Sequence, residues 1–188
     1  MSLDKVWFSY VDYRPDPGMP QKDRIALGCI LEARASRGRL FSIAGRTELT
    51  ESELMLMDGI GRETLLHPAD FLKQELRRVL DRADDEVPFE QGGTLRELSR
   101  VHRWSVHVMP PRLIRIERHL SQTNIQALHT SSEELLIAHL LGREVPLTRP
   151  LRAKRIVPED WRAQVPPAWQ IAHSSLAAPV RLHARPRA

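Results

Sequence analysis

The sequence predicts an α+β fold: an antiparallel β-meander of about four or five strands packed against about three or four helices, with a basic, proline-containing C-terminal extension. Three observations support this prediction. Strand-like segments follow one another up to residue 45, and helical patterns dominate from residue 50 to residue 142. Beyond residue 148 the composition shifts toward arginine and proline.

The first three strands are expected at residues 5–13, 24–34 and 39–45. The first segment is rich in aromatic and β-branched side chains, which strands favour. The second is almost continuously apolar, as expected for a strand covered on both faces. Residues 36–38 read Ser-Arg-Gly and predict a hairpin between the second and third strands. A glycine inside the second strand, Gly28, indicates that a helix or another backbone approaches closely there.

Helix starts are indicated by a Thr-x-x-Glu pattern, because the hydroxyl and the carboxylate each satisfy an otherwise unpaired amide. The pattern occurs at Thr50/Glu53, Thr94/Glu97 and Thr130/Glu133. Another helix is expected to begin at Pro68, since proline suits the first helical position. Its apolar stripe consists of Phe71, Leu72, Leu76, Val79 and Leu80. The helix from Thr130 is expected to end at Gly142.

The remaining segments are shorter. Residues 104–109 alternate as a strand, which Pro110 and Pro111 should end because proline has no amide to donate. Residues 112–118 predict a further strand at a sheet edge. Residues 56–65 resemble a helix-hairpin-helix element, but we interpret them as a glycine helix stop and a loop, because the following proline would break the second helix.

Charge divides the chain into two parts. Up to Thr148 there are 20 Lys and Arg against 22 Asp and Glu. Residues 149–188 carry eight basic and two acidic residues, and six of the fourteen prolines. We therefore expect a single α+β domain at residues 4–148 and a basic extension at residues 149–188.

The extension contains the main candidates for binding. Its arginine cluster would neutralise the phosphates of a nucleic acid, assisted by the outer face of the helix from Pro68. The residues of this prediction are Arg149, Arg152, Lys154 and Arg155 with Lys73, Arg77, Arg78 and Arg82. Two indoles, Trp161 and Trp169, could stack on bases or fill pockets on a protein partner. The interpretation that we favour is that both rings pack on the body and hold the extension in place.

Residues with catalytic or metal-binding chemistry form no recognisable motif. The densest acidic cluster, Asp84, Asp85 and Glu86, could hold a metal ion, but adjacent carboxylates in a loop usually stay solvated. The eight histidines follow no metal-ligand spacing, so we interpret them as solvated or singly hydrogen-bonded. The single cysteine, Cys29, is expected to be a buried thiol. We expect no metal and no cofactor.

The chain resembles a bacterial family known as domain of unknown function 3037. Its members open with an aromatic strand that ends in Arg and Pro-Asp, followed by a strand that reads acidic-x-x-Asn-hydrophobe-Gly-hydrophobe. The corresponding residues here are 8–10, 14–16 and 23–31. Ala26 stands in place of the Asn, and the later order, with a strand opening at Trp104 and a helix from Thr130, is also similar. The resemblance covers most of residues 5–142, and it implies a small α+β body but no particular activity.

Taken together, the patterns favour a bacterial cytoplasmic protein that is not an enzyme and that binds a protein partner or itself as an oligomer. One alternative is a nucleic-acid-binding protein that uses the arginine-rich extension. A second alternative is a metal-dependent hydrolase that uses residues 84–86 with a histidine. No apolar run approaches the roughly 20 residues needed to span a bilayer, and no secretory signal is recognisable, so we expect no membrane partner.

Overall fold

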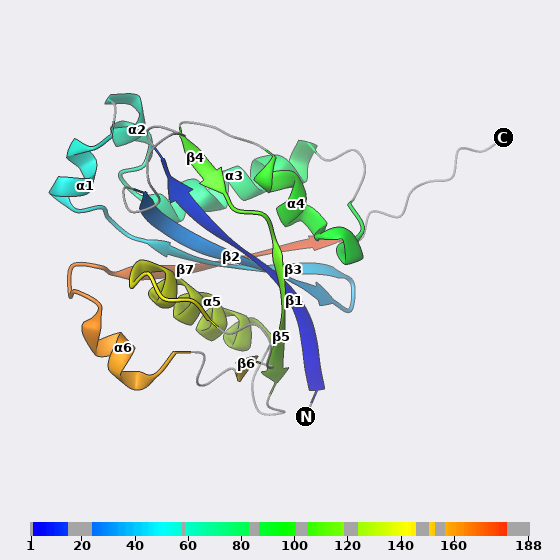
Figure 1. Cartoon of the computed structure of the whole chain (residues 1–188). Helices are drawn as coiled ribbons and strands as arrows, with labels where there is room; N and C mark the ends of the chain where they lie inside the picture. The colour runs from blue at the N-terminus through cyan, green and yellow to red at the C-terminus, as the bar shows by residue number, and fades with distance from the viewer. Residues whose placement is uncertain are drawn as a thin grey trace.

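The computed structural model describes residues 2–14, 24–57, 59–82, 87–100, 105–118, 124–145, 151–152 and 157–179. These residues form an α+β fold in which one seven-stranded sheet carries helices on both faces (Figure 1). The strand order is β6-β5-β1-β2-β3-β7, with β4 beside β1. The predicted fold class is confirmed, although the sheet has more strands and the described residues contain more helices than expected.

The centre of the sheet is the predicted meander of three strands. It consists of β1 (Ser2–Tyr13), β2 (Ile25–Ala35) and β3 (Gly38–Arg46). Both neighbouring pairs are antiparallel, and the turn between β2 and β3 falls at residues 36–37 as the hairpin pattern predicted. The pairing of β1 with β2 shifts register between Val11 and Asp12, which marks a β-bulge.

Two later strands both pair with β1, one after the other along its length. β4 (Val106–Val108) pairs with the end of β1, and β5 (Arg112–Arg118) pairs with its beginning. The two prolines lie between these strands, so the break that they predicted is present. The prediction that β5 lies at an edge needs correction, because the short parallel strand β6 (Leu151–Arg152) pairs with it.

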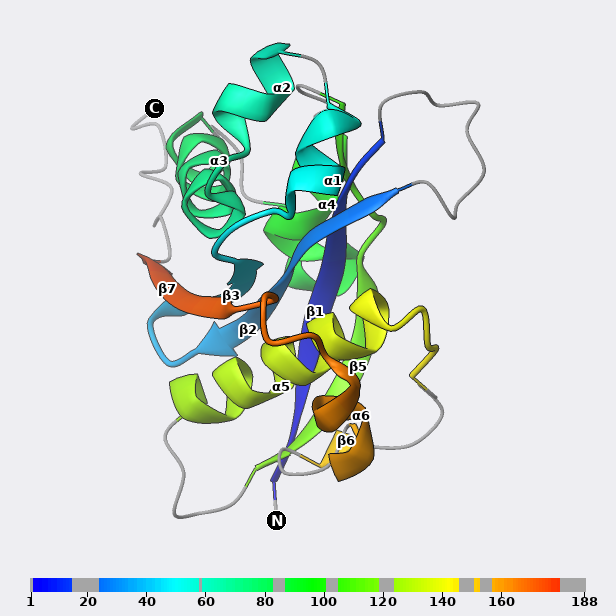
Figure 2. The same ribbon diagram turned by 90° about the vertical axis from the view of Figure 1, so that its left-hand side faces the viewer.

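The last described strand, β7 (Ile171–Pro179), pairs antiparallel with β3 over all nine of its residues. It therefore belongs to the same sheet as the predicted domain at residues 4–148. The boundary expected at residue 149 leaves this strand out, because charge composition does not record which segments pair in space. Figure 2 shows β7 at the outer margin of the sheet, between α3 and α5.

Six α-helices and one 3₁₀ turn occur within the described residues. They are α1 (Glu51–Met55), α2 (Gly59–Thr64), α3 (Pro68–Arg82), η2 (Phe89–Gln91), α4 (Gly93–Ser99), α5 (Asn124–Leu140) and α6 (Glu159–Gln164). Two predicted starts are confirmed: Thr50 forms a complete capping box with Glu53, and α3 begins at Pro68. The segment expected to be a loop after Gly59 is instead the short helix α2, which ends at Thr64 before the proline.

The other two capping boxes are absent. Helix α5 begins at Asn124, so Thr130 lies inside it, whereas its end before Gly142 agrees with the prediction. Helix α4 begins at Gly93, and the amides of Thr94 and Leu95 donate to the carboxylate of Glu32 on β2, each at 3.1 Å. A carboxylate from a distant strand thus caps α4, and a local sequence pattern cannot reveal such a cap.

Glu32 is the centre of a buried polar group, which we call the Glu32 cluster and define as Glu32, Arg39 and Thr94. Arg39 Nη1 donates to Glu32 Oε1 at 2.6 Å and to Thr94 Oγ1 at 3.3 Å, and its Nη2 donates to the carbonyl of Val87. Burial raises the pKa of the Glu32 carboxyl, although the hydrogen bond from Thr94 and the charge of Arg39 act in the opposite direction. The cluster connects β2 and β3 to α4.

The hydrophobic core has two halves, one on each face of the sheet. One half packs under α5 and includes Cys29, whose predicted burial is confirmed; burial also raises the pKa of its thiol. The other half packs under α3 and α4. Gly28 allows the close approach predicted for it, because a Cβ there would meet the carbonyl oxygen of Ala44 at 2.6 Å and would also overlap Leu72 of α3.

Candidate functional site

The outer side of β7 is the first candidate surface. Among the described residues, no strand pairs with this side, and the strand contains no Lys, Arg, Asp or Glu. The opposite margin of the sheet is different, because β6 is only two residues long and β5 presents exposed Arg112 and Arg115. Proteins commonly protect sheet edges with short strands and charged side chains. Only the β6 margin has that protection.

The hydrogen bonds of β3 show which amides of β7 are directed outward. Thr47 N donates to the carbonyl of Gln170 at 2.9 Å, one step beyond the paired residues Arg46 and Ile171. Hydrogen-bonded and non-hydrogen-bonded pairs alternate along an antiparallel ladder. The even-numbered residues of β7 therefore bond to β3. The outward amides and carbonyls belong to Ile171, His173, Ser175 and Ala177. We call these outward groups the β7 edge.

Side chains on both faces hold β7 in place. Ile171 packs with the core under α5, whereas Leu176 and Ala178 pack with the core under α3. His173 Nε2 lies 3.3 Å from Glu133 Oε2 of α5, and the hydrogen bond lowers the pKa of that carboxyl. Because the strand is fixed on both sides, its edge is a rigid surface.

A charged pocket lies where the chain enters β7, and it is the second candidate site. Its cavity volume is about 350 Å³. The lining residues are Arg24, Ala26, Glu53, His139, Leu140, Gly142 and Trp169. They come from the start of β2, from α1, from the end of α5 and from the segment that precedes β7. The pocket therefore joins parts of the chain that are far apart in sequence.

Asp12 and His139 form a pair at one side of this pocket. Asp12 is fully buried at the bulge of β1, and its Oδ1 lies 2.6 Å from His139 Nε2. The imidazole stacks on Tyr10 with ring centroids 4.0 Å apart, and burial raises the pKa of that phenol. Arg24 Nη1 lies 3.5 Å from Asp12 Oδ2, an oxygen that has no hydrogen-bond partner among the described residues.

Arg46 and Glu53 form a second pair beside the pocket. Arg46 Nη1 donates to Glu53 Oε1 at 2.6 Å, while its buried Nε and Nη2 have no partner within the described part of the chain. Burial raises the pKa of Glu53, but the hydrogen bonds from Arg46 and Thr50 outweigh it, and the pKa is lowered overall. The guanidinium carbon of Arg46 lies 5.3 Å from the centre of the Trp169 ring. We call Asp12, Arg24, Arg46, Glu53 and His139 the pocket cluster.

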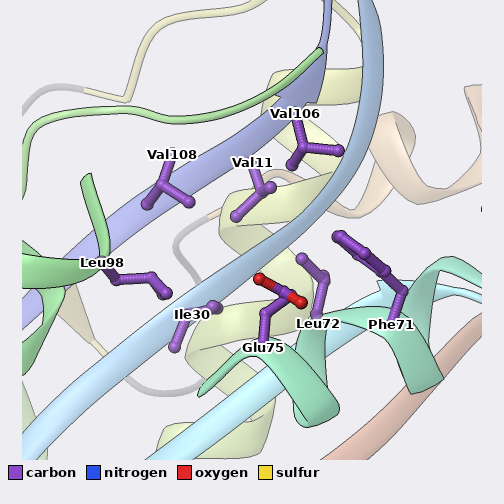
Figure 3. Close-up of a pocket in the computed structure, with 8 residues that line it drawn as sticks. All are labelled: Val11, Ile30, Phe71, Leu72, Glu75, Leu98, Val106 and Val108. Carbon is purple, nitrogen blue, oxygen red and sulfur yellow. The ribbon is translucent and has the colours of Figure 1, made fainter. Parts of the chain in front are cut away.

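A smaller cavity lies between the sheet and α3, and it is almost entirely apolar. Figure 3 shows its lining side chains from β1, β2, β4, α3 and α4, with the carboxylate of Glu75 as the polar group among them. Its volume is about 20 Å³. A space of this size holds about one water molecule. We interpret it as a gap in core packing rather than as a ligand site.

The residues predicted to bind nucleic acid are only partly described. On α3, Arg77 is exposed, while Lys73 and Arg78 are half-buried, and Arg78 Nη2 donates to Glu75. Arg152 lies in β6, but its side chain is not described. The predicted residues outside the described part are Arg149, Lys154 and Arg155. Nucleic-acid binding therefore stays a prediction.

Both indoles of the extension lie against the body. Trp161 of α6 packs with the core under α5, and the guanidinium of Arg143 lies 4.7 Å from its ring centre. Trp169 lines the charged pocket and lies over Arg46. This is the arrangement that we favoured from the sequence. A role of these indoles in binding a partner stays a prediction.

The acidic cluster at residues 84–86 and the opening of the expected strand at Trp104 lie outside the described residues. Within the described part, no three His, Cys, Asp or Glu side chains are grouped so that they could hold a metal ion. Likewise, no helix of that part is both long and apolar enough to cross a bilayer.

Sequence reasoning did not identify the pocket cluster. Its members lie in or beside five elements, so no spacing motif connects them. One signal was present: Asp12 follows the apolar Val11 near the end of the first strand, Arg46 stands at the end of the third, and charged side chains are rarely buried without a partner.

Comparisons with known proteins found no matching family model, no matching curated protein and no matching solved structure. The resemblance to domain of unknown function 3037 therefore stays a prediction.

Proposed function

We propose that this protein is a non-enzymatic binding module that associates with a second copy of itself through the β7 edge. One observation carries the proposal: β7 is a nine-residue edge strand without Lys, Arg, Asp or Glu, and no described strand covers it. Unpaired amides and carbonyls along such a strand are a template for strand addition.

A second copy fits this edge for two reasons. In an antiparallel pair around a two-fold axis, each outward amide meets an outward carbonyl of the same strand in the other copy. The side chains are also compatible, since Ser174, Ser175, Ala177 and Ala178 are small and neutral. Like charges that face each other across strands would oppose the pairing, and β7 has no Lys, Arg, Asp or Glu to produce that repulsion.

The two alternative functions depend on other residues. Nucleic-acid binding depends mainly on the arginine cluster at residues 149–155, and the hydrolase depends on residues 84–86. Of these, only residues 151–152 are described. Neither alternative has support comparable to that of the β7 edge, so self-association is the function that the geometry favours.

Mass photometry and light scattering across a dilution series test the proposal with the variant Ser175→Pro. The wild type should dissociate from dimer to monomer on dilution. Proline at residue 175 removes an outward amide and places its ring toward the partner, while the bonds to β3 stay intact. We expect the dimer to weaken by about 100-fold, which corresponds to about 3 kcal/mol.

Ser175→Ala is the matched control, because it keeps the amide and should dimerise like the wild type. The unfolding midpoint of the monomeric Ser175→Pro protein should match that of the wild-type monomer. A wild-type protein that is monomeric at every concentration would overturn the proposal, and so would a Ser175→Pro protein that dimerises as strongly as Ser175→Ala.

A further inference from the structure

The charged pocket has the size of a small-molecule site. Its cavity volume is about 350 Å³, and ligand pockets typically start at about 300 Å³. Its lining combines the polar side chains Arg24, Glu53 and His139 with the flat ring of Trp169 and the apolar Ala26 and Leu140. Polar groups that converge beside an aromatic ring can orient a ligand in such a pocket.

Hydrogen-bond donors outnumber the acceptors available to them in this pocket. A guanidinium has five N–H groups. Among the described residues, Arg24 forms an ion pair with Asp12 at 3.5 Å, and its side chain is 26% exposed. Arg46 is buried beside the pocket and does not line it; it uses Nη1 and leaves Nε and Nη2 without a hydrogen-bond partner among the described residues. His139 engages a described partner through Nε2 alone.

The neighbouring acceptors are largely occupied. Glu53 Oε1 accepts from Arg46, and Glu53 Oε2 accepts from the amide and the hydroxyl of Thr50. Asp12 Oδ1 is bonded to His139. The remaining acceptor, Asp12 Oδ2, is buried and lies 3.5 Å from Arg24 Nη1. A ligand that satisfies the surplus donors must therefore supply acceptor oxygens.

Charge limits the kind of oxygen that fits. Arg24 and Arg46 balance Asp12 and Glu53 within the pocket cluster. A carboxylate can pair with the forked guanidinium of Arg24 and adds one negative charge to this balanced cluster, whereas a doubly charged phosphate adds two and is the less favourable ligand. The ring of Trp169 provides a flat surface for the rest of the ligand.

We propose that this pocket binds a small carboxylic acid with a flat apolar body, whose carboxylate pairs with Arg24 and whose body lies against Trp169. The site is separate from the β7 edge, so this proposal does not depend on self-association.

Benzoate is the probe for the first test, with benzamide as its neutral analogue and inorganic phosphate as the competing oxyanion. Binding is measured by isothermal titration and by the shift of the Trp169 indole N–H resonance, which is assigned with Trp169→Phe. Benzoate should bind saturably and should shift this resonance. Benzamide and phosphate should each bind at least about tenfold more weakly, because a charge-assisted pair is about 1.4 kcal/mol or more stronger than a neutral contact.

The second test compares Arg24→Gln with Arg34→Gln, a matched loss of an arginine whose partner is the exposed Glu90. Benzoate should bind Arg24→Gln at least about tenfold more weakly and Arg34→Gln as strongly as the wild type. The variant Arg24→Lys keeps the charge, so it should bind benzoate with an affinity between those of the wild type and Arg24→Gln. If Arg24→Gln does not fold, Arg24→Lys is used in its place. The proposal is wrong if benzoate does not bind, if benzamide or phosphate binds equally well, or if loss of Arg24 has no effect.

Discussion

The two buried polar clusters lie on opposite faces of the sheet and differ in how completely their hydrogen bonds are formed. In the Glu32 cluster, the carboxylate accepts from Arg39 and from two amides of α4, and Arg39 bonds to three separate oxygens. In the pocket cluster, one oxygen of Asp12 and two nitrogens of Arg46 are buried without a hydrogen-bond partner among the described residues. A cavity of about 350 Å³ adjoins the pocket cluster. A second cavity of about the same volume is lined by Trp7 and Arg34, the cross-strand neighbours of Glu32 and Arg39.

This difference separates a structural role from a binding role. A buried polar network that is fully bonded stabilises one arrangement of the chain. A network with buried groups left unpaired loses stability, and such groups suggest a function other than stability. The comparison therefore supports a structural role for the Glu32 cluster and the proposed ligand-binding role for the pocket cluster.

The largest effect is expected from Arg39→Met. This change leaves the Glu32 carboxylate buried without its counter-charge, which typically costs about 3–5 kcal/mol. Urea denaturation should show this loss in the free energy of unfolding. Arg34→Gln, which breaks an exposed ion pair, should change it by less than about 1 kcal/mol. A loss in Arg39→Met as small as that in Arg34→Gln would mean that the Glu32 cluster does not stabilise the fold.

Arg46→Met should have a smaller effect, about 1 kcal/mol, although Arg46 is even more buried than Arg39. The change removes two nitrogens that lack a hydrogen-bond partner among the described residues, together with the charge. The remaining Glu53 side chain is 20% exposed and keeps its bonds from Thr50. The same urea series measures this difference. If Arg46→Met loses as much stability as Arg39→Met, the proposed contrast between the clusters is wrong.

The smallest expected effect is on the pH dependence of the free energy of unfolding. Here the carboxyls of Glu32 and Glu53 are expected to act in opposite directions. The raised pKa of Glu32 means that its contribution to stability is present below the ordinary glutamate pKa and is lost as pH rises through the folded-state value. The lowered pKa of Glu53 means that its contribution is present above the ordinary value and is lost as pH falls.

Unfolding free energies of the wild type, Glu32→Gln and Glu53→Gln, measured between neutral pH and about pH 3, test these opposite signs. As pH falls, the free energy of unfolding of the wild type should increase relative to that of Glu32→Gln and decrease relative to that of Glu53→Gln. If the free energies of unfolding of Glu32→Gln and Glu53→Gln change with pH in the same way relative to the wild type, the opposite pKa shifts of the two carboxyls are contradicted.

Features that depend on neighbours in sequence could be predicted. The alternation and apolar content of residues 5–45 predicted β1, β2 and β3, and the capping box at Thr50 and the proline at residue 68 predicted two helix starts. The same capping pattern failed at Thr94, because Glu32 supplies the acceptor there. Local patterns therefore predict a helix start correctly unless a residue far away in sequence accepts the hydrogen bonds of the first helical amides.

The candidate sites could not be predicted in this way. No pattern in the residues of β7 indicates that it pairs with β3. The basic composition of residues 149–188 suggested a separate extension instead. The pocket cluster brings Asp12 to His139 across 127 positions of the chain. Only the charged residues next to apolar residues at the ends of β1 and β3 indicated that buried pairs would form.

The sequence by itself determined the fold class, the central meander and the close approach at Gly28, because periodicity, turn chemistry and residue size act over a few neighbouring positions. The tertiary structure alone decided which strand forms the edge that no described strand covers, and which buried polar atoms lack a hydrogen-bond partner among the described residues. These properties depend on the long-range pairing of segments, and no local pattern in the chain encodes that pairing.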